Sequence, residues 1–259
     1  MSTLRAGWII TQRELAHWAR QPWGPVFNLL FSIMLLLVFG FLFGGAIIVP
    51  GGGDYLDFLL PGMLALSMMF GVEGTALKMA GDARKGITDR FRSMPMGSAS
   101  VALGRVGADM ANSAVELLVL ILGGLLIGWR ITGDPGSAAL AVVLLLLLRL
   151  AMLWIGIFLG LSFPGEGATA AVQVLVWPIG FLSTAIVSSE TMPDWLGAIA
   201  AWNPLSATAT ATRQLFGNPT GVTEGVLADW AVWLAIGWPV LLIAVFVPLS
   251  ARAYRNLSR

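Results

Sequence analysis

One apolar run indicates the class of protein to which the chain belongs. Residues 139–162 read ALAVVLLLLLRLAMLWIGIFLGLS, and Arg149 is the only charged residue among them. A helix of about 20 residues crosses the hydrocarbon core of a bilayer, which is about 30 Å thick. The run is therefore long enough and apolar enough to span a membrane as a helix.

Five other runs have the same character. The six runs lie at residues 26–49, 56–77, 111–129, 139–162, 168–188 and 230–249. With 57% apolar and only 11% charged residues, the chain is too apolar for a soluble core of ordinary composition. The first run lacks a small-residue cleavage site, which favours a retained span over a signal peptide. The sequence predicts an all-α integral membrane protein with six transmembrane helices in one domain, residues 1–259.

The basic residues predict the orientation of these spans. Twelve of the 15 Lys and Arg residues lie before the first run, between the second and third runs, or after the sixth. Because basic residues concentrate in cytoplasmic segments, both termini are expected in the cytoplasm. The chain is thus predicted to be a multi-pass protein of the inner or plasma membrane. The basic residues lie between apolar runs and do not form the stripe that would indicate nucleic-acid binding.

The N-terminal segment, residues 1–25, is predicted to form an amphipathic helix in the cytoplasmic interface. Its apolar and basic residues recur on separate faces at helical spacing. The residues that carry this pattern are Trp8, Arg13, Leu15, Trp18 and Arg20. A simple basic anchor with aromatic residues at the interface explains the same pattern, and both interpretations stay open.

The cytoplasmic connection, residues 78–107, contains a second amphipathic pattern. Ile87, Phe91 and Met94 recur at i, i+4 and i+7, and Pro95 ends the helix that they predict. The polar residues of this stretch include Asp82, Arg84, Lys85, Gly86, Asp89 and Arg90. Such a surface packs either on lipid headgroups or in a groove of a partner protein, and the pattern alone leaves both open.

The outer connection, residues 189–228, predicts short helices that cannot cross the membrane. Pro193 suits the first turn of a helix that contains Trp195, and Asn203 with Pro204 suits its end. This helix would have about ten residues and a length of about 15 Å. A second short segment, residues 205–216, contains Arg213. The chain is expected to dip into the outer leaflet and return; a single helix on the surface is the alternative.

The composition argues against an enzyme. The chain contains no Cys, and its single His, His17, lies outside the six runs, so neither an intramembrane protease nor a metal site is expected. Its only lysines, Lys78 and Lys85, do not end a phosphate-binding glycine loop. We expect no catalytic residue, metal or cofactor in this chain. A transporter, a channel or a passive membrane scaffold remain.

Three stretches, in register with the six runs, resemble the permeases of ABC type-2 exporters, in particular the daunorubicin-resistance-like group. The first is GDYLDFLLPG at residues 53–62, and the second is residues 82–95 followed by Gly104, Arg105 and Asp109. The third joins ETMPDWL at residues 190–196 to WNPL at 202–205 and RQL at 213–215. The resemblance extends over essentially the whole chain.

The resemblance implies a role for each of the segments outside the spans. Residues 1–25 would be the connecting helix, residues 82–95 the coupling helix seated in a separate ABC ATPase, and residues 189–228 the extracellular re-entrant pair. It also implies two ATPase copies, which bind ATP and Mg, and a second permease, identical or paralogous. Two residues depart from the expected pattern: Gly81 replaces an acidic residue, and Arg149 lies in a span expected to be apolar.

The leading functional hypothesis is ATP-driven export of a hydrophobic or amphipathic compound, such as a drug, an antibiotic or a lipid-like molecule. ATP hydrolysis in the partner would move the coupling helix and tilt the first, second and fifth spans. Candidate lining residues are Phe27, Phe31, Met68, Met69, Trp177 and Phe181. Contact with membrane lipid or core packing is the alternative for each of them. Export of a lipid-linked glycan, or a scaffold or immunity protein without transport, are the alternative functions.

The charge of Arg149 predicts a partner inside the bundle, because an isolated charge at this depth is costly. Glu116 lies 13 residues inward from Trp129, and Arg149 lies 11 residues inward from Ala138. At 1.5 Å per residue these depths differ by about 3 Å. The third and fourth spans are therefore predicted to share a structural Glu116–Arg149 ion pair.

Overall fold

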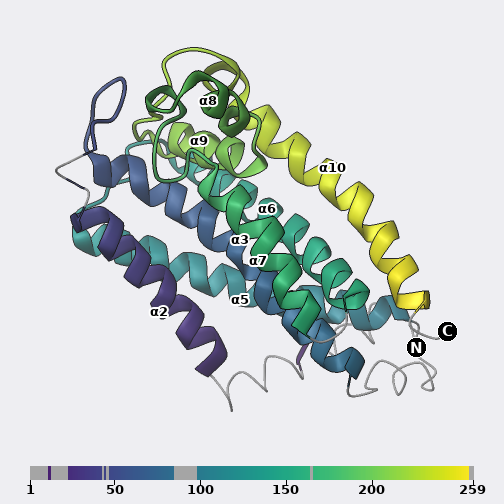
Figure 1. Cartoon of the computed structure of the whole chain (residues 1–259). Coiled ribbons are helices and arrows are strands. Elements are labelled where there is room, and N and C mark those ends of the chain that lie inside the picture. Colours follow the sequence, from purple (N-terminus) through teal and green to yellow (C-terminus); the bar gives the residue numbers. More distant parts are fainter. Residues whose placement is uncertain are drawn as a thin grey trace.

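A computed structural model describes residues 11–12, 23–42, 44, 47–84, 98–163 and 166–256. Every regular element in these ranges is a helix, as the sequence predicts (Figure 1). The elements are α2 (Trp23–Leu37), the π-helix η1 (Val38–Leu42), α3 (Tyr55–Arg84), α5 (Ser98–Ile127), α6 (Pro135–Ser162), α7 (Glu166–Phe181), the 3₁₀-helix η2 (Ser189–Thr191), α8 (Asp194–Ala201), α9 (Pro204–Phe216) and α10 (Val226–Asn256).

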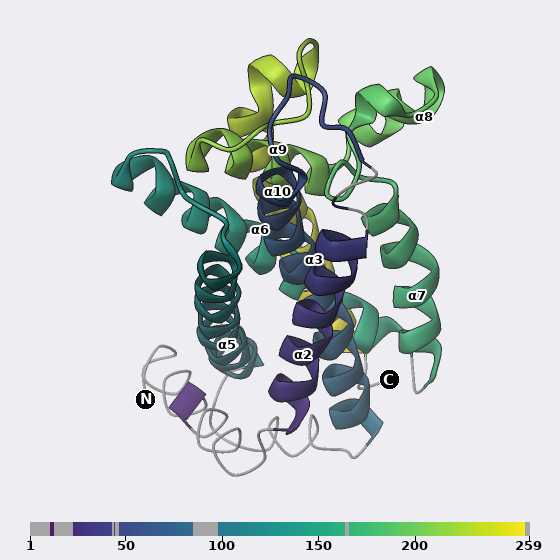
Figure 2. The ribbon, with the colours of Figure 1, turned by 90° about the vertical axis from the view of Figure 1, so that its left-hand side faces the viewer.

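Four helices are long and apolar enough to cross a membrane: α3, α5, α6 and α10. They correspond to the second, third, fourth and sixth apolar runs. The first and fifth runs form shorter apolar helices, α2 continued by η1, and α7. Both shorter helices run alongside the long ones in Figures 1 and 2.

The two shorter helices end before the apolar runs do, for local reasons. Gly40 lies inside η1 and Gly44 follows it, and glycine weakens a helix because it has many conformations to lose. At the end of α7, the Ser183 hydroxyl donates to the Gly180 carbonyl at 2.6 Å. Such local side-chain hydrogen bonds compete with continuation of the helix. Residues 182–187, which follow α7, form bends and turns.

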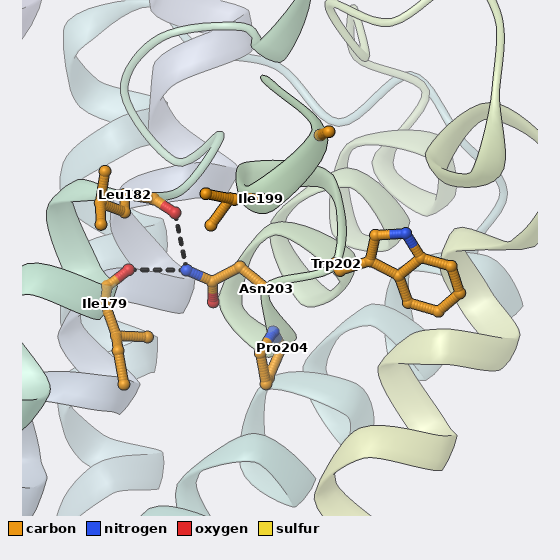
Figure 3. A pocket seen from close by; sticks show the side chains of 7 residues that line it. Ile179, Leu182, Ile199, Trp202, Asn203 and Pro204 are labelled. Carbon is orange, nitrogen blue, oxygen red and sulfur yellow. Dashed lines mark hydrogen bonds between the residues drawn. The ribbon is translucent and has the colours of Figure 1, made fainter. Parts of the chain in front are cut away.

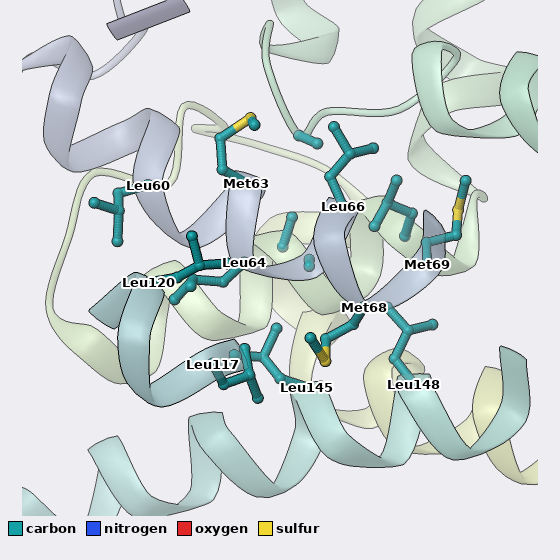
Figure 4. Packing of buried hydrophobic residues seen from close by; sticks show 14 of the residues in the cluster. Leu60, Met63, Leu64, Leu66, Met68, Met69, Leu117, Leu120, Leu145 and Leu148 are labelled. Atoms are coloured by element: carbon teal, nitrogen blue, oxygen red, sulfur yellow. The ribbon is translucent and has the colours of Figure 1, made fainter. Parts of the chain in front are cut away.

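Helix α3 forms the centre of the bundle and is buried along most of its length. Figure 4 shows its Leu and Met side chains among those of α5 and α6. Two glycines of α6, Gly156 and Gly160, bring α6 very close to α3. A Cβ on Gly160 would lie only 2.4 Å from the Ala76 carbonyl oxygen. This spacing of small residues is typical of packed membrane helices, because it increases van der Waals contact between backbones.

The outer end of the bundle is closed by α8 and α9. The Asn203 side chain accepts from the Leu205 N–H, and Pro204 is the first residue of α9, which favours a helix start there. Asn203 and Pro204 thus begin α9, besides following the end of α8 at Ala201. Gly217 ends α9 with a φ of 73°, a left-handed conformation that glycine adopts readily. Helix α9 is almost wholly buried and packs on α3, α6 and α10.

Residues from several elements meet at the opposite end of the bundle. Met79, Val106, Leu153 and Tyr254 share one apolar cluster, which joins α3, α5, α6 and α10. The Thr11 hydroxyl donates to the Gly104 carbonyl oxygen at the same end, at 2.9 Å. The basic residues predict that this end faces the cytoplasm.

Candidate functional site

The six side chains predicted to line a transport path fall into two main groups. Three are exposed aromatic residues of α2 and α7: Phe27, Phe31 and Phe181. Two are buried within the packing core around α3: Met68 and Met69. The two Met side chains pack against neighbouring helices. In this conformation they therefore belong to the packing core, which was the alternative to lining a transport path.

The sixth candidate, Trp177 of α7, lies partly buried against α3. The centroid of its ring is 4.8 Å from that of Phe70 and 6.0 Å from that of Phe181. Its Nε1–H donates a long hydrogen bond to Glu73 Oε2 at 3.4 Å. The sequence argument does not include Glu73 among the site residues, although a carboxylate within an apolar run, here four residues before its end, is a signal for function.

Arg149 is buried between α6, α5 and α3. Its Nε donates to Ser113 Oγ at 2.8 Å, and its guanidinium lies where a side chain on Gly71 would otherwise stand. Asp109 and Glu116 lie four residues before and three residues after Ser113, and both attract the Arg149 charge. The residue that Arg149 contacts is thus Ser113, which the sequence argument did not single out. A direct ion pair between Arg149 and Glu116 stays a prediction.

The same face of α5 joins further polar groups of α2 and α3. Asp109 accepts from Thr75 Oγ1 at 3.3 Å, and its other oxygen lies 3.6 Å from Lys78 Nζ. Glu116 Oε1 accepts from Ser32 Oγ of α2 at 3.3 Å. We call Asp109, Ser113 and Glu116, with these partners and Arg149, the α5 polar seam. The seam connects four helices inside the bundle.

A second charged contact lies at the end of α3 and α5 that is opposite to α8 and α9. Arg105 Nη1 donates to Asp82 Oδ2 at 2.5 Å, and both side chains are largely shielded from solvent. The sequence places Asp82 at the start of the predicted coupling helix, but in the structure Asp82 lies in the last turn of α3, and Arg105 lies on α5. Their ion pair joins the two helices on either side of residues 85–97. Arg84 ends α3 and is exposed.

The remaining residues predicted for ATPase coupling and for the interfacial helix lie outside the described residues. They are Lys85, Gly86, Ile87, Asp89, Arg90, Phe91, Met94 and Pro95, and Trp8, Arg13, Leu15, Trp18 and Arg20.

Arg213 joins three segments at the outer end of the bundle. It is fully buried, and its Nε donates to the Phe58 carbonyl oxygen of α3 at 2.7 Å. Its Nη2 donates to the carbonyl oxygens of Thr184 and Ala185, each at 2.9 Å. The guanidinium also lies over the Phe58 ring, 3.6 Å from the centroid. Gly62 allows this approach, because a Cβ there would lie 1.9 Å from the Ala185 oxygen.

Asn203 joins the end of α7 to the start of α9. Its Nδ2 donates to the carbonyl oxygens of Ile179 and Leu182, at 2.7 and 2.8 Å (Figure 3). Those two carbonyls end α7, so one side chain stabilises two helix ends. Beside it lies an open apolar pocket of about 550 Å³, lined by Ile179, Leu182, Ala198, Ile199, Trp202, Asn203 and Pro204.

The outer loops are held together by their own hydrogen bonds. Glu190 Oε1 accepts from the Thr223 N–H at 2.5 Å, which lowers the pKa of Glu190. Trp129 Nε1–H donates to Asn218 Oδ1 at 3.0 Å. Pro193 was expected in the first turn of α8 and instead lies just before its first residue, Asp194. Trp195 is exposed. The outer end is therefore an ordered cap.

Comparison with known proteins gives the family. The model of the ABC-2 type transporter family matches residues 5–216. A daunorubicin resistance ABC transporter permease protein of Streptomyces coeruleorubidus is 34% identical over 230 residues, which cover 88% of this chain and 78% of that protein. A protein of Mycobacterium tuberculosis named "Probable doxorubicin resistance ABC transporter permease protein" is 23% identical, over 88% of this chain and 86% of its own length. The chain therefore belongs to the ABC-2 type transporter family and is a permease subunit of the drug-resistance type.

Proposed function

We propose that this permease exports a hydrophobic or amphipathic compound, with the energy of ATP hydrolysed by a separate ABC ATPase. The observation that carries the proposal is the 34% identity to a daunorubicin resistance permease over most of both chains. The sequence supports the need for a partner, since neither of its lysines ends a phosphate-binding loop. ATP and Mg would be bound by that partner.

The proposed working unit contains two permeases and two ATPases. Each permease would have six spans in the inner or plasma membrane, with α2 and η1 as the first span and α7 as the fifth. Helices α8 and α9 would be the re-entrant pair, and the burial of α9 supports this because a non-spanning segment enters a membrane only where protein covers it.

The proposed coupling route begins at the cytoplasmic connection. Movement of residues 85–97 by the ATPase would pull on both α3 and α5, which Asp82 and Arg105 hold together. The α5 polar seam continues from there toward the centre of the bundle through Lys78 and Asp109. These two ion pairs between α3 and α5 would help the two helices to transmit this motion together.

The orientation can be tested with cysteines, because the chain contains none. A membrane-impermeant maleimide added to intact cells should label Ser137→Cys, near the start of α6, and Thr220→Cys, in the outer loop. Ser98→Cys, at the start of α5, should label only after the cells are opened. Labelling of Ser98→Cys in intact cells would reverse the proposed orientation.

The docking of the ATPase can be tested at Phe91. Burial of a Phe side chain in a partner groove contributes about 1.5 to 3 kcal/mol. Since 1.4 kcal/mol is tenfold in affinity, Phe91→Ala should weaken ATPase binding roughly 10- to 150-fold and abolish permease-stimulated ATP hydrolysis. Co-purification with the ATPase and its hydrolysis rate are the measurements.

Arg92→Gln is the matched control, because it changes the charged face and leaves the apolar stripe. It should keep at least half of the stimulated ATPase activity. Wild-type recovery and stimulation in Phe91→Ala would contradict docking at this stripe. A wild-type chain that neither binds nor stimulates an ABC ATPase would contradict the exporter and favour a scaffold.

A further inference from the structure

Glu73 places a carboxylate inside a membrane-spanning helix. It lies 18 residues from the start of α3 and 11 from its end, or about 27 and 17 Å along the helix axis. Its side chain is partly accessible, unlike the buried Asp109 and Glu116 of the polar seam. The second apolar run ends at Leu77, so Glu73 lies about 6 Å inside that end of the run. An ionisable group within an apolar run is a candidate functional residue.

Within the described part of the chain, Glu73 takes part in neither of the two ion pairs, which are Lys78–Asp109 and Arg105–Asp82. Its hydrogen bond is the long one from Trp177 Nε1–H, at 3.4 Å. This neutral donor does not balance the carboxylate charge. The carboxylate of Glu73 is therefore available to pair with the positive charge of a ligand.

Trp177, which donates to this carboxylate, belongs to a row of aromatic rings. Phe70, Trp177 and Phe181 form a continuous row, with centroids 4.8 and 6.0 Å apart, and Phe181 is exposed. Gly180 allows the row to form, because a Cβ on it would lie 3.3 Å from the Phe70 ring. The negative faces of aromatic rings attract organic cations, most strongly where water is scarce.

We propose that Glu73 and the rings of Phe70, Trp177 and Phe181 bind the positively charged group of an amphipathic organic cation. This inference rests on the proposed function and specifies its cargo class. The rings receive the apolar part of the ligand, and the carboxylate receives its charge. A metal ion does not fit this chemistry, because Ca²⁺ and Mg²⁺ need six or more oxygen ligands and the aromatic row provides none.

The test uses the full-length chain in lipid nanodiscs and radiolabelled tetraphenylphosphonium, an aromatic cation with a permanent charge. Glu73→Gln keeps the size and the acceptor oxygen but removes the charge, so it should weaken binding at least tenfold. Glu73→Asp keeps the charge and should stay within about threefold of wild type. Uncharged triphenylphosphine oxide should compete poorly with the cation in wild type, and equally poorly in Glu73→Gln.

Asp57→Asn is the control for charge removal elsewhere on α3 and should leave binding unchanged. All variants should have the melting temperature of wild type, so that lost binding is not lost folding. Unchanged binding in Glu73→Gln, or equal loss in Asp57→Asn, would overturn the site. If ATP-driven transport is observed and Glu73→Gln binds the cation like wild type, the result contradicts the cation site but supports the exporter. If binding is charge-selective but the chain does not stimulate an ATPase, the result supports the cation site but contradicts the exporter.

Discussion

Arg213→Met is expected to destabilise the outer cap by at least about 3 kcal/mol, because it leaves buried acceptors unsatisfied at a cost of about 1 to 3 kcal/mol each. The guanidinium supplies hydrogen bonds to three carbonyl oxygens, of Phe58, Thr184 and Ala185, in a fully buried site. Met has a similar length but no donor, so all three carbonyls would lose a partner away from water. That loss should exceed the gain from no longer burying a cation, which the carbonyls and the Phe58 ring already stabilise.

Two further variants separate the possible causes. Arg213→Lys keeps the charge but lacks the planar fork that reaches separate carbonyls, so it should recover only part of the loss. Arg130→Gln is the matched control at the same end of the bundle, where Arg130 also donates to carbonyls but is exposed. It should cost about 0.5 kcal/mol or less.

Unfolding in mixed detergent micelles, followed by circular dichroism, gives the free energy for each variant. If Arg213→Met unfolds like wild type, Arg213 does not hold the cap, and the close approach at Gly62 must be stabilised by packing alone.

The position of Arg213 shows what a sequence can and cannot predict for this fold. Apolar runs of about 20 residues give the helices, because length and hydropathy are local properties. They do not show that residue 213 meets residues 58 and 184–185, since that meeting depends on how α3, α7 and α9 pack. Two of the stretches that resemble the family, residues 53–62 and residues 213–215, are far apart in the sequence. In the structure Arg213 contacts Phe58 and lies beside Gly62, so the two stretches pack together.

The ends of helices were harder to predict than their cores. The sequence extended the fifth run to residue 188, but α7 ends at Phe181, where Ser183 and Asn203 bind its last carbonyls. Hydropathy does not include such hydrogen bonds. Asn203 was assigned to the end of one helix, and its amide instead serves the end of α7 and the start of α9 together.

The sequence predicts which aromatic residues belong to the candidate site, but it does not predict their contacts. Aromatic residues on α2 and α7 were identified from the sequence, and Trp177 does contact α3. Hydropathy does not single out Glu73, because one carboxylate hardly changes the mean hydropathy of a long apolar run. Its relation to Trp177 depends on the packing of α3 against α7, which no local pattern contains.

The α5 polar seam explains why Arg149 is tolerated in an apolar span. The charge lies between two carboxylates on one face of α5, and Ser113 between them accepts its hydrogen bond. Both carboxylates have other partners: Asp109 has Thr75 and Lys78, and Glu116 has Ser32. The charge on Arg149 is thus balanced by a network more than by one residue.

Arg149→Leu is expected to cost about 3 to 5 kcal/mol of stability, because it leaves Asp109 and Glu116 without the buried cation that balances them. Glu116→Gln should cost less, since Asp109 still attracts Arg149 and Ser32 can still donate to the amide oxygen. In the double variant, the loss should be smaller than the sum of the single losses by about 1 to 3 kcal/mol, the range measured for residues in one network.

The same cycle with Asp57→Asn should be additive, because Asp57 lies 14 residues from Gly71 on α3, or about 21 Å from the Arg149 contact. The cycle is measured as unfolding free energy in micelles, with expression level as a second readout. Additive losses for Arg149→Leu and Glu116→Gln would show that the two charges do not act on each other. A parallel cycle with Asp109→Asn compares the two carboxylates. Coupling of Arg149 to Glu116 that is larger than its coupling to Asp109 would support the direct ion pair, whereas equal couplings would mean that Arg149 is shared between the two carboxylates.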